Sequence, residues 1–378
     1  MKANRIALTA ILISIFTQVY GQTDSLQQDS LLMLIQNELN SSPAVGSMGS
    51  VRSLTISNPR ISAIGDMQTW YNPQAKTPVG AALNEMEFSF QSAVDPYARA
   101  DVYFTVEHNP LTGENSSGIE EAYLTTLSLP AQLQLRVGRL KPAFGKINTI
   151  HSHVNPFIDY PVSWSRYFGS GLAGDGFSLS WLVPQTLFYQ EITAEAIDGA
   201  IESPVFSAPQ QNGLLYSAHL KNFFELNENT SLEWGLSALT GPNDSSRMSS
   251  IYGSDLTLKW KPLQLNTYKS LTWQNEIYFG HLGWGEPTGT LHTYGLYSLL
   301  SWQFAKRWKV TGRYDYGQDL YDRSKTGWSA AMMFGWYATE FQKIELESSW
   351  VAQPGIQAGP GFKLRWIFVI GSHGAHQY

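Results

Sequence analysis

Apolar and polar residues alternate along most of the chain, apart from its N-terminal part. Val102, Phe104 and Val106 alternate with polar neighbours, and the same period of two recurs in 85–91 and 362–370. Successive side chains of a β-strand point to opposite faces of the sheet. The pattern therefore predicts strands with one apolar and one polar face.

The alternation, read between clusters of turn residues, predicts sixteen strands. They are expected at 60–71, 82–94, 98–108, 119–129, 132–140, 176–184, 188–198, 213–226, 230–240, 250–261, 270–283, 291–305, 307–317, 327–338, 342–352 and 361–371. Most reach the roughly 9–11 residues that cross a bilayer, and single-chain bacterial barrels have an even strand number. The predicted fold class is all-β: a transmembrane antiparallel β-barrel of about 16 strands over 59–378.

The predicted connections alternate in length. Short ones such as 95–97 and 227–229 alternate with longer ones such as 109–118, 241–249 and 353–360. Outer-membrane barrels have short periplasmic turns and longer outer loops. Both chain ends are therefore expected on the periplasmic side.

The longest connection, 139–176, lies between two short strand-like runs and has no helical or strand period. Connections of this length inside a compact domain are usually functional. We expect it to fold partly into the lumen and to control permeation, with an outer lid as the alternative. Its aromatic residues are expected to pack against one inner wall: Phe144, Phe157, Tyr160, Trp164, Tyr167 and Phe168. The charged candidates for a pore constriction are Lys141, Lys146, Asp159, Arg166 and Asp175.

The N-terminus has the pattern of a secretory signal peptide. Lys2 and Arg5 precede an apolar run over 6–20, and Val19 and Gly21 are small enough for a cleavage site. Residues 1–21 are thus predicted to be removed, and an anchoring helix is the alternative. Residues 22–58 are expected to form a short periplasmic amphipathic helix and a linker. The helix, at 24–40, is interpreted as a lid or packing helix, or as an oligomerisation or partner site.

Composition narrows the class of protein. Charged residues make up only 15% of the chain, against about a quarter in a typical domain, whereas aromatics make up 13%. Beyond the N-terminal run, no segment is apolar for the length of a transmembrane helix, about 18 residues or more. This combination favours a membrane barrel over a soluble enzyme. A net charge of −6 argues against a nucleic-acid partner, and the absence of cysteine excludes disulfides and thiolate sites.

Three stretches carry a family resemblance: VGRLKPAFGKIN (137–148), HSHVNPFIDYP (151–161) and GLAGDGFSLSWLVP (171–184). With them, the chain resembles Gram-negative outer-membrane porins, in particular the phosphate-selective porin O and P-like family. The resemblance implies a passive diffusion channel for small hydrophilic solutes or ions, with a constriction loop after the fifth strand. It also implies a possible homotrimer, contact with membrane lipids and lipopolysaccharide, and assembly by the barrel-assembly machinery. The C-terminal aromatic Tyr378 is typical of such barrels.

The resemblance also limits the solute. The anion-selective members of that family have ladders of inward Lys and Arg. In this chain, the strand positions that the alternation predicts to face inward carry more acids than bases. Phosphate is therefore not expected. The main charged candidates for the lumen wall are Glu85, Glu87, Asp101, Arg136, Arg313, Lys363 and Arg365. They either keep the lumen hydrated or set up a transverse field at the constriction.

Catalytic and metal chemistry have little support in the sequence. No Gly-x-Ser-x-Gly elbow and no phosphate-binding Gly loop occurs, so we expect neither an enzyme nor a cofactor. His151 and His153 are weak metal candidates, since one pair supplies only two ligands, and His373 with His376 is a second pair. A closed outer-membrane barrel with a binding or structural role is the alternative to a channel.

Overall fold

The computed structural model describes residues 59–371 except 76, 109–112, 199–202, 207–212, 266–267 and 285–288. The predicted signal peptide (1–21), the helix and linker in 22–58, and the C-terminal residues that include Tyr378 lie outside the described residues. Among the described residues, no helix is both long and apolar enough to cross a membrane.

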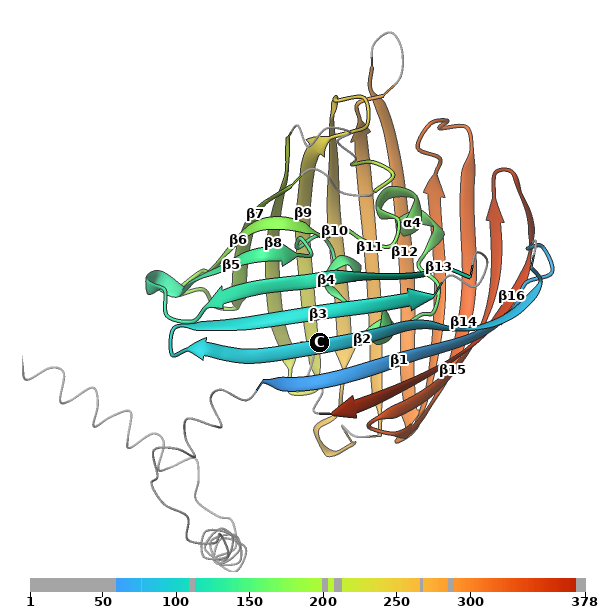
Figure 1. Ribbon diagram of the computed structural model, residues 1–378, viewed down its shortest axis with the longest axis horizontal. Helices are drawn as coiled ribbons and strands as arrows, with labels where there is room; N and C mark the ends of the chain where they lie inside the picture. Colours follow the sequence, from blue (N-terminus) through green and yellow to red (C-terminus); the bar gives the residue numbers. More distant parts are fainter. Residues whose placement is uncertain are drawn as a thin grey trace, which may run out of the picture. The chain divides into compact units, whose positions relative to one another are not determined.

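Sixteen antiparallel strands form a closed barrel in which each strand pairs with its sequence neighbours and β1 pairs with β16 (Figure 1). They are β1 (Arg60–Tyr71), β2 (Val79–Asp95), β3 (Ala98–His108), β4 (Asn115–Thr126), β5 (Leu133–Leu140), β6 (Gly174–Leu182), β7 (Tyr189–Asp198), β8 (Leu214–Asn227), β9 (Thr230–Pro242), β10 (Met248–Trp260), β11 (Ser270–Leu282), β12 (Leu291–Ala305), β13 (Trp308–Gln318), β14 (Thr326–Thr339), β15 (Gln342–Gln353) and β16 (Ile356–Gly371). Within the described residues, the helical elements are η1 (Pro130–Gln132), η2 (Ile147–Thr149), η3 (Ser152–Val154), α4 (Val162–Phe168) and η4 (Leu263–Leu265). The predicted fold class and strand number are confirmed.

The two faces of the wall differ as the alternation predicts. On β11, Trp273 and Phe279 are exposed, whereas Glu276 and Tyr278 between them are buried. The same alternation continues on β16, where Trp366 is exposed and Arg365 is buried. The exposed apolar face is the outer one, because a closed barrel in a bilayer turns that face to lipid.

One predicted connection is wrong. The stretch 353–360 was expected to be a long loop, but β15 and β16 pair up to Gln353 and Ile356. Pro354 and Gly355 alone make the turn, and Gly355 has a φ of 78°. A positive φ is favourable at glycine and is typical of two-residue hairpin turns.

Candidate functional site

The segment between β5 and β6, residues 141–173, lies inside the barrel. Its polar atoms bind inward-facing side chains of β2, β7, β9, β11, β15 and β16, and α4 packs beside β12 and β13. These strands are distributed around the whole ring (Figure 1). A segment that touches inner faces on all sides of a closed barrel must lie within it. We refer to it as the inner segment.

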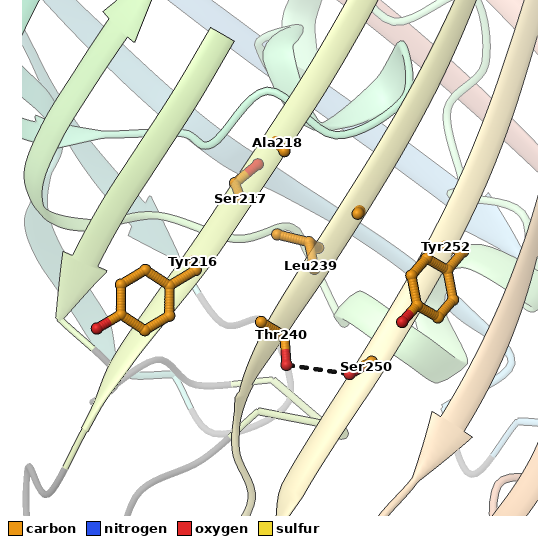
Figure 2. Close-up of a pocket in the computed structure, with 8 residues that line it drawn as sticks. Tyr216, Ser217, Ala218, Leu239, Thr240, Ser250 and Tyr252 are labelled. Carbon is orange, nitrogen blue, oxygen red and sulfur yellow. Dashed lines mark hydrogen bonds between the residues drawn. The ribbon is translucent and has the colours of Figure 1, made fainter.

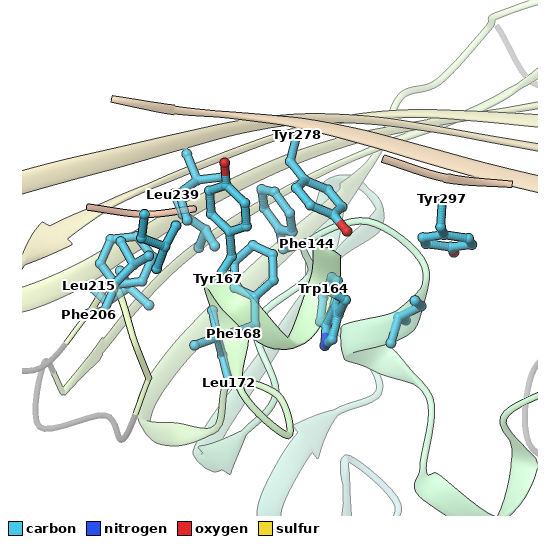
Figure 3. Close-up of a cluster of buried hydrophobic side chains, with 14 of the residues drawn as sticks. Phe144, Trp164, Tyr167, Phe168, Leu172, Phe206, Leu215, Leu239, Tyr278 and Tyr297 are labelled. Atoms are coloured by element: carbon cyan, nitrogen blue, oxygen red, sulfur yellow. The ribbon is translucent and has the colours of Figure 1, made fainter. Parts of the chain in front are cut away.

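An aromatic cluster fixes one half of the inner segment to the wall. Trp164, Tyr167 and Phe168 of α4 have no exposed surface. Phe168 packs on Trp164 and Phe144, with ring centroids 4.3 and 5.0 Å apart, and Tyr167 meets Tyr278 of β11 at 5.2 Å. Figure 3 shows these rings converging on Tyr278. In this half of the segment, the aromatic side chains are buried as predicted.

Carboxylates of the wall accept hydrogen bonds from the backbone of the inner segment. The pairs are Ala143 N–H with Glu195 (2.7 Å), Lys146 N–H with Glu276 (2.7 Å) and Ile158 N–H with Glu347 (2.9 Å). At Gly145 the φ is 56°, and a Cβ there would lie 2.5 Å from the Glu276 carboxylate. Glycine is therefore required where the chain turns over this carboxylate.

Two arginines of the wall bind backbone carbonyls of the same segment. Arg365 pairs with Glu345 at 2.6 Å and donates to the carbonyl oxygen of Asn155 at 3.1 Å. Arg313 donates to the carbonyl oxygen of Asp159. Acids and bases of the inner wall thus satisfy the backbone of an irregular segment, which buried backbone groups require.

Four of the five constriction candidates lie inside the barrel with a partner on the wall. Lys141 pairs with Glu120 at 2.5 Å, Lys146 with Glu233 at 2.6 Å, and Asp159 with Lys363. Arg166 donates to the carbonyl oxygen of Gly317 at 2.9 Å. Asp159 and Lys363 keep 42% and 31% of their side-chain surface exposed, so this pair is accessible to solvent.

Asp175 does not belong with them. It is the second residue of β6 and lies across from Arg139, on the same face as Phe177 and Leu179. Those two apolar side chains are exposed on the outer face of the wall. Because side chains alternate along a strand, Asp175 also points outward, and its proposed place in the constriction is wrong.

The seven candidates for the lumen wall all lie on the inner face. Arg313, Lys363 and Arg365 bind the inner segment as described. Asp101 pairs with Arg99 at 2.6 Å, and Arg136 lies 3.6 Å from a Glu195 oxygen. The remaining two, Glu85 and Glu87, approach the inner segment at Ser152 and at the histidines.

Both histidines of the inner segment are buried against carboxylates. His151 Nδ1 lies 3.1 Å from a Glu87 oxygen and 3.1 Å from a Glu120 oxygen, and its Nε2 lies 3.0 Å from Glu121. His153 Nδ1 lies 3.2 Å from the same Glu87 oxygen. We call these five residues the histidine–glutamate cluster.

Electrostatic effects on His151 oppose one another. Burial and the Lys141 ammonium lower the pKa of its imidazole. Hydrogen bonds with the three glutamates outweigh both and raise this pKa well above its ordinary value. Burial likewise lowers the pKa of Lys141, but the charges of Glu120 and Glu121 raise it above the ordinary range.

Sequence reasoning missed Glu120 and Glu121, because two adjacent acids do not fit a strict alternation of inward and outward side chains. The pairing shifts here: Tyr103 pairs with Glu121, and Phe104 pairs with Ile119. Glu120 is the extra residue of a β-bulge, which re-aims side chains. The adjacent acids between Ile119 and Ala122 were the available signal, since they interrupt the alternation.

A shallow pocket between β8, β9 and β10 lies elsewhere (Figure 2). Tyr216 and Tyr252 flank it and are exposed on the outer face, and Thr240 is hydrogen-bonded to Ser250 at 3.0 Å. The pocket contains no charged residue. Ser217, which also lines it, donates a hydrogen bond to the carbonyl oxygen of Ala143 in the inner segment at 3.2 Å.

Comparisons with known proteins agree with the fold. No protein-family model matches the chain. An uncharacterized protein of Aquifex aeolicus is 29% identical over 346 residues, which cover 79% of this chain and 70% of that protein. It carries no function to this chain.

Three solved structures are similar in fold. An anion-selective porin from Comamonas acidovorans has a TM-score of 0.58 at 10% identity, with 82% of this chain and 99% of that chain covered. OprB of Pseudomonas putida has a TM-score of 0.58 at 8% identity, with 86% of this chain and 97% of that chain covered. The outer membrane channel DcaP of Acinetobacter baumannii has a TM-score of 0.57 at 9% identity, with 82% of this chain and 97% of that chain covered.

These likenesses show the architecture. The narrower resemblance to the phosphate-selective porin O and P-like family stays a prediction. The closed sixteen-stranded wall, its apolar outer face and its structural neighbours agree with the predicted location in the outer membrane of a Gram-negative bacterium. The chain therefore has the fold of an outer-membrane porin.

Proposed function

We propose that this protein is a passive diffusion channel for small hydrophilic solutes or ions, narrowed by the inner segment. The supporting observation is that this segment is bound to inner-wall side chains on all sides of the barrel. A segment held there leaves a smaller cross-section for solutes, and charged side chains beside that opening set ion selectivity. We assign it transport rather than bond-making chemistry.

A closed barrel with a binding or structural role is the second candidate. It is favoured by the burial of Arg365 and Glu347, which are only 1% and 2% exposed and face the inner segment rather than water. Single-channel recording in planar bilayers separates the two functions. Stepwise ohmic currents support the channel, and silence from correctly folded protein supports the closed barrel.

The organisation around the barrel belongs to the same proposal. Residues 1–21 would be removed on export, and 22–58 would lie in the periplasm. Membrane lipids and lipopolysaccharide would surround the apolar outer face, the barrel-assembly machinery would insert the chain, and a homotrimer would be the working form. Native mass determination in detergent tests the last point.

We expect the shorter connections to face the periplasm. Epitope tags inserted at Asn115 and Asp244, both exposed next to longer connections, should react with antibody on intact cells. A tag at Asn229, in the tight turn between β8 and β9, should react only after the outer membrane is permeabilised. Labelling in the opposite pattern would contradict this orientation.

Ion selectivity should respond to the exposed pair Asp159 and Lys363. Asp159→Asn removes the partner of the Lys363 ammonium, which then acts as an uncompensated positive charge beside the opening. The reversal potential in asymmetric salt should shift toward anions. Asp322→Asn is a matched control, because it removes the partner of Lys325 in an exposed loop between β13 and β14. Equal shifts in both variants would show that Asp159 does not line the ion path.

A further inference from the structure

The histidine–glutamate cluster brings three potential metal ligands to one point. One ligand atom from each of Glu87, Glu120 and His151 lies within 4.8 Å of the other two. Ligand bonds to zinc of about 2.0–2.2 Å put tetrahedral ligand atoms roughly 3.3–3.6 Å apart. His151 Nδ1 lies 3.1 Å from each glutamate oxygen. A shift of a few tenths of an ångström would therefore suit a metal ion.

The orientation of the imidazole fits coordination through Nδ1. Nε2 of His151 lies 3.0 Å from Glu121, to which an Nε2–H would donate. When a metal ion replaces the Nδ1 proton, the neutral ring presents its Nδ1 lone pair to the ion between the same two carboxylate oxygens. Metal-bound histidines commonly donate their other ring N–H to a carboxylate in this way. A proton on Nδ1 would have to be shared between the two oxygens, whereas a metal ion binds both.

Charge also favours a dication. Glu87, Glu120 and Glu121 face the Lys141 ammonium, which pairs with Glu120. Three carboxylates and one ammonium leave two negative charges. A protonated His151 imidazole offsets one of them, whereas a dication bound to the neutral ring offsets both. Buried carboxylates of this kind are normally paired or bound to a metal.

A separate observation concerns the Glu87 carboxylate. Glu87 is 1% exposed, and its Oε1 atom has no hydrogen-bond partner, although Oε2 is in contact with both histidines. A buried carboxylate oxygen without a partner is costly. Bidentate binding of a cation would satisfy it.

We propose that His151, Glu87 and Glu120 bind a divalent transition-metal ion of the zinc class, with Glu121 and His153 holding the ligands in place. One imidazole and two carboxylates form a mixed nitrogen–oxygen set, which suits such ions better than Ca²⁺ or Mg²⁺. Glu120 is the most exposed of the ligands, at 21% of its side chain, and so marks the side from which the ion enters. The bound ion would join the inner segment to β2 and β4.

Isothermal titration calorimetry with ZnCl₂ tests the proposal on the full-length mature protein, folded in detergent and purified without a histidine tag. We expect about one ion per barrel with micromolar affinity or tighter. His151→Asn should abolish this binding, and Glu120→Gln should weaken it strongly. Glu121→Gln should weaken it about 10–100-fold, the usual effect of losing a partner of a ligand. Circular dichroism reports whether each variant has the parental β content.

Matched histidines elsewhere provide the control. His281 and His292 form an exposed cross-strand pair with ring centroids 4.7 Å apart, and His281→Asn with His292→Asn should leave the binding unchanged. His373→Asn with His376→Asn should do the same. Loss of binding in either control, parental affinity in Glu120→Gln, or no binding by the parent protein would overturn the proposal. Equal affinity for Ca²⁺ would overturn the metal class. None of these results depends on whether the barrel conducts.

Discussion

Replacing residues 147–160 with a six-residue Gly/Ser linker is expected to raise single-channel conductance severalfold and to admit larger sugars. These residues cross between the Glu276 side of the barrel and the Arg365 side, whereas the aromatic cluster at α4 lies outside the deletion. An extended linker of that length spans up to about 20 Å. Phe144 and Phe168, which flank the deleted residues on either side, have ring centroids only 5.0 Å apart, so a linker of this length can join the two ends.

The barrel should survive this deletion. Its strands are hydrogen-bonded to one another around the whole ring without help from the inner segment. Arg365 and Glu347 would lose their backbone partners, but a wider lumen would give them water instead. Removing a partner from a buried charge is severe only where no water replaces it. The free energy of unfolding of the barrel should therefore fall only slightly, while the conductance rises severalfold.

The comparison for this experiment is a Gly/Ser replacement of Asp244–Ser246. This loop tip lies between β9 and β10, and its residues are exposed. It should conduct like the parent protein. If the 147–160 replacement also conducts like the parent, the inner segment does not narrow the pore.

The strands could be predicted because their period is short and repeated. The predicted bounds 60–71, 98–108 and 291–305 match β1, β3 and β12 residue by residue. The prediction weakened where alternation was interrupted by Gly and Pro, as in 353–360. There the backbone still pairs: Gly359 lies opposite Val351. Pairing between strands is set by the partner as well as by the local sequence, so a local pattern misses it.

The inner site was only partly predictable. The alternation of side chains along each strand predicts that Glu87 and Arg365 point into the barrel. It does not reveal whether such an inward charge contacts water or another segment of the chain. The wall charges were expected to hydrate the lumen or set up a transverse field. Many instead bind the backbone of the inner segment, a contact across more than a hundred residues of sequence in the case of Glu276. The inward position of Glu120 was not predicted because a β-bulge interrupts the alternation of side chains there. Asp175 was wrongly placed in the loop because β6 already begins at Gly174.

The aromatic cluster gives the strongest prediction for stability. Phe168→Ala should weaken docking of the inner segment by about 3–5 kcal/mol, the usual cost of removing a buried Phe side chain. Phe168 has no exposed surface and contacts both Trp164 and Phe144, so the cavity would open in the centre of the cluster. Such a loss raises the undocked population roughly a hundred- to several-thousand-fold, since each 1.4 kcal/mol is about tenfold.

Limited proteolysis with trypsin in detergent measures this population. Lys146 is largely buried against Glu233 in the docked segment, so cleavage after it requires undocking. It should be slow in the parent protein and much faster in Phe168→Ala. Phe279→Ala is the matched control, because it removes an aromatic ring of β11 from the exposed outer face. It should be cut at the parental rate. Equal cleavage rates in the parent and Phe168→Ala would mean that the wall charges, rather than the aromatic cluster, hold the segment in place.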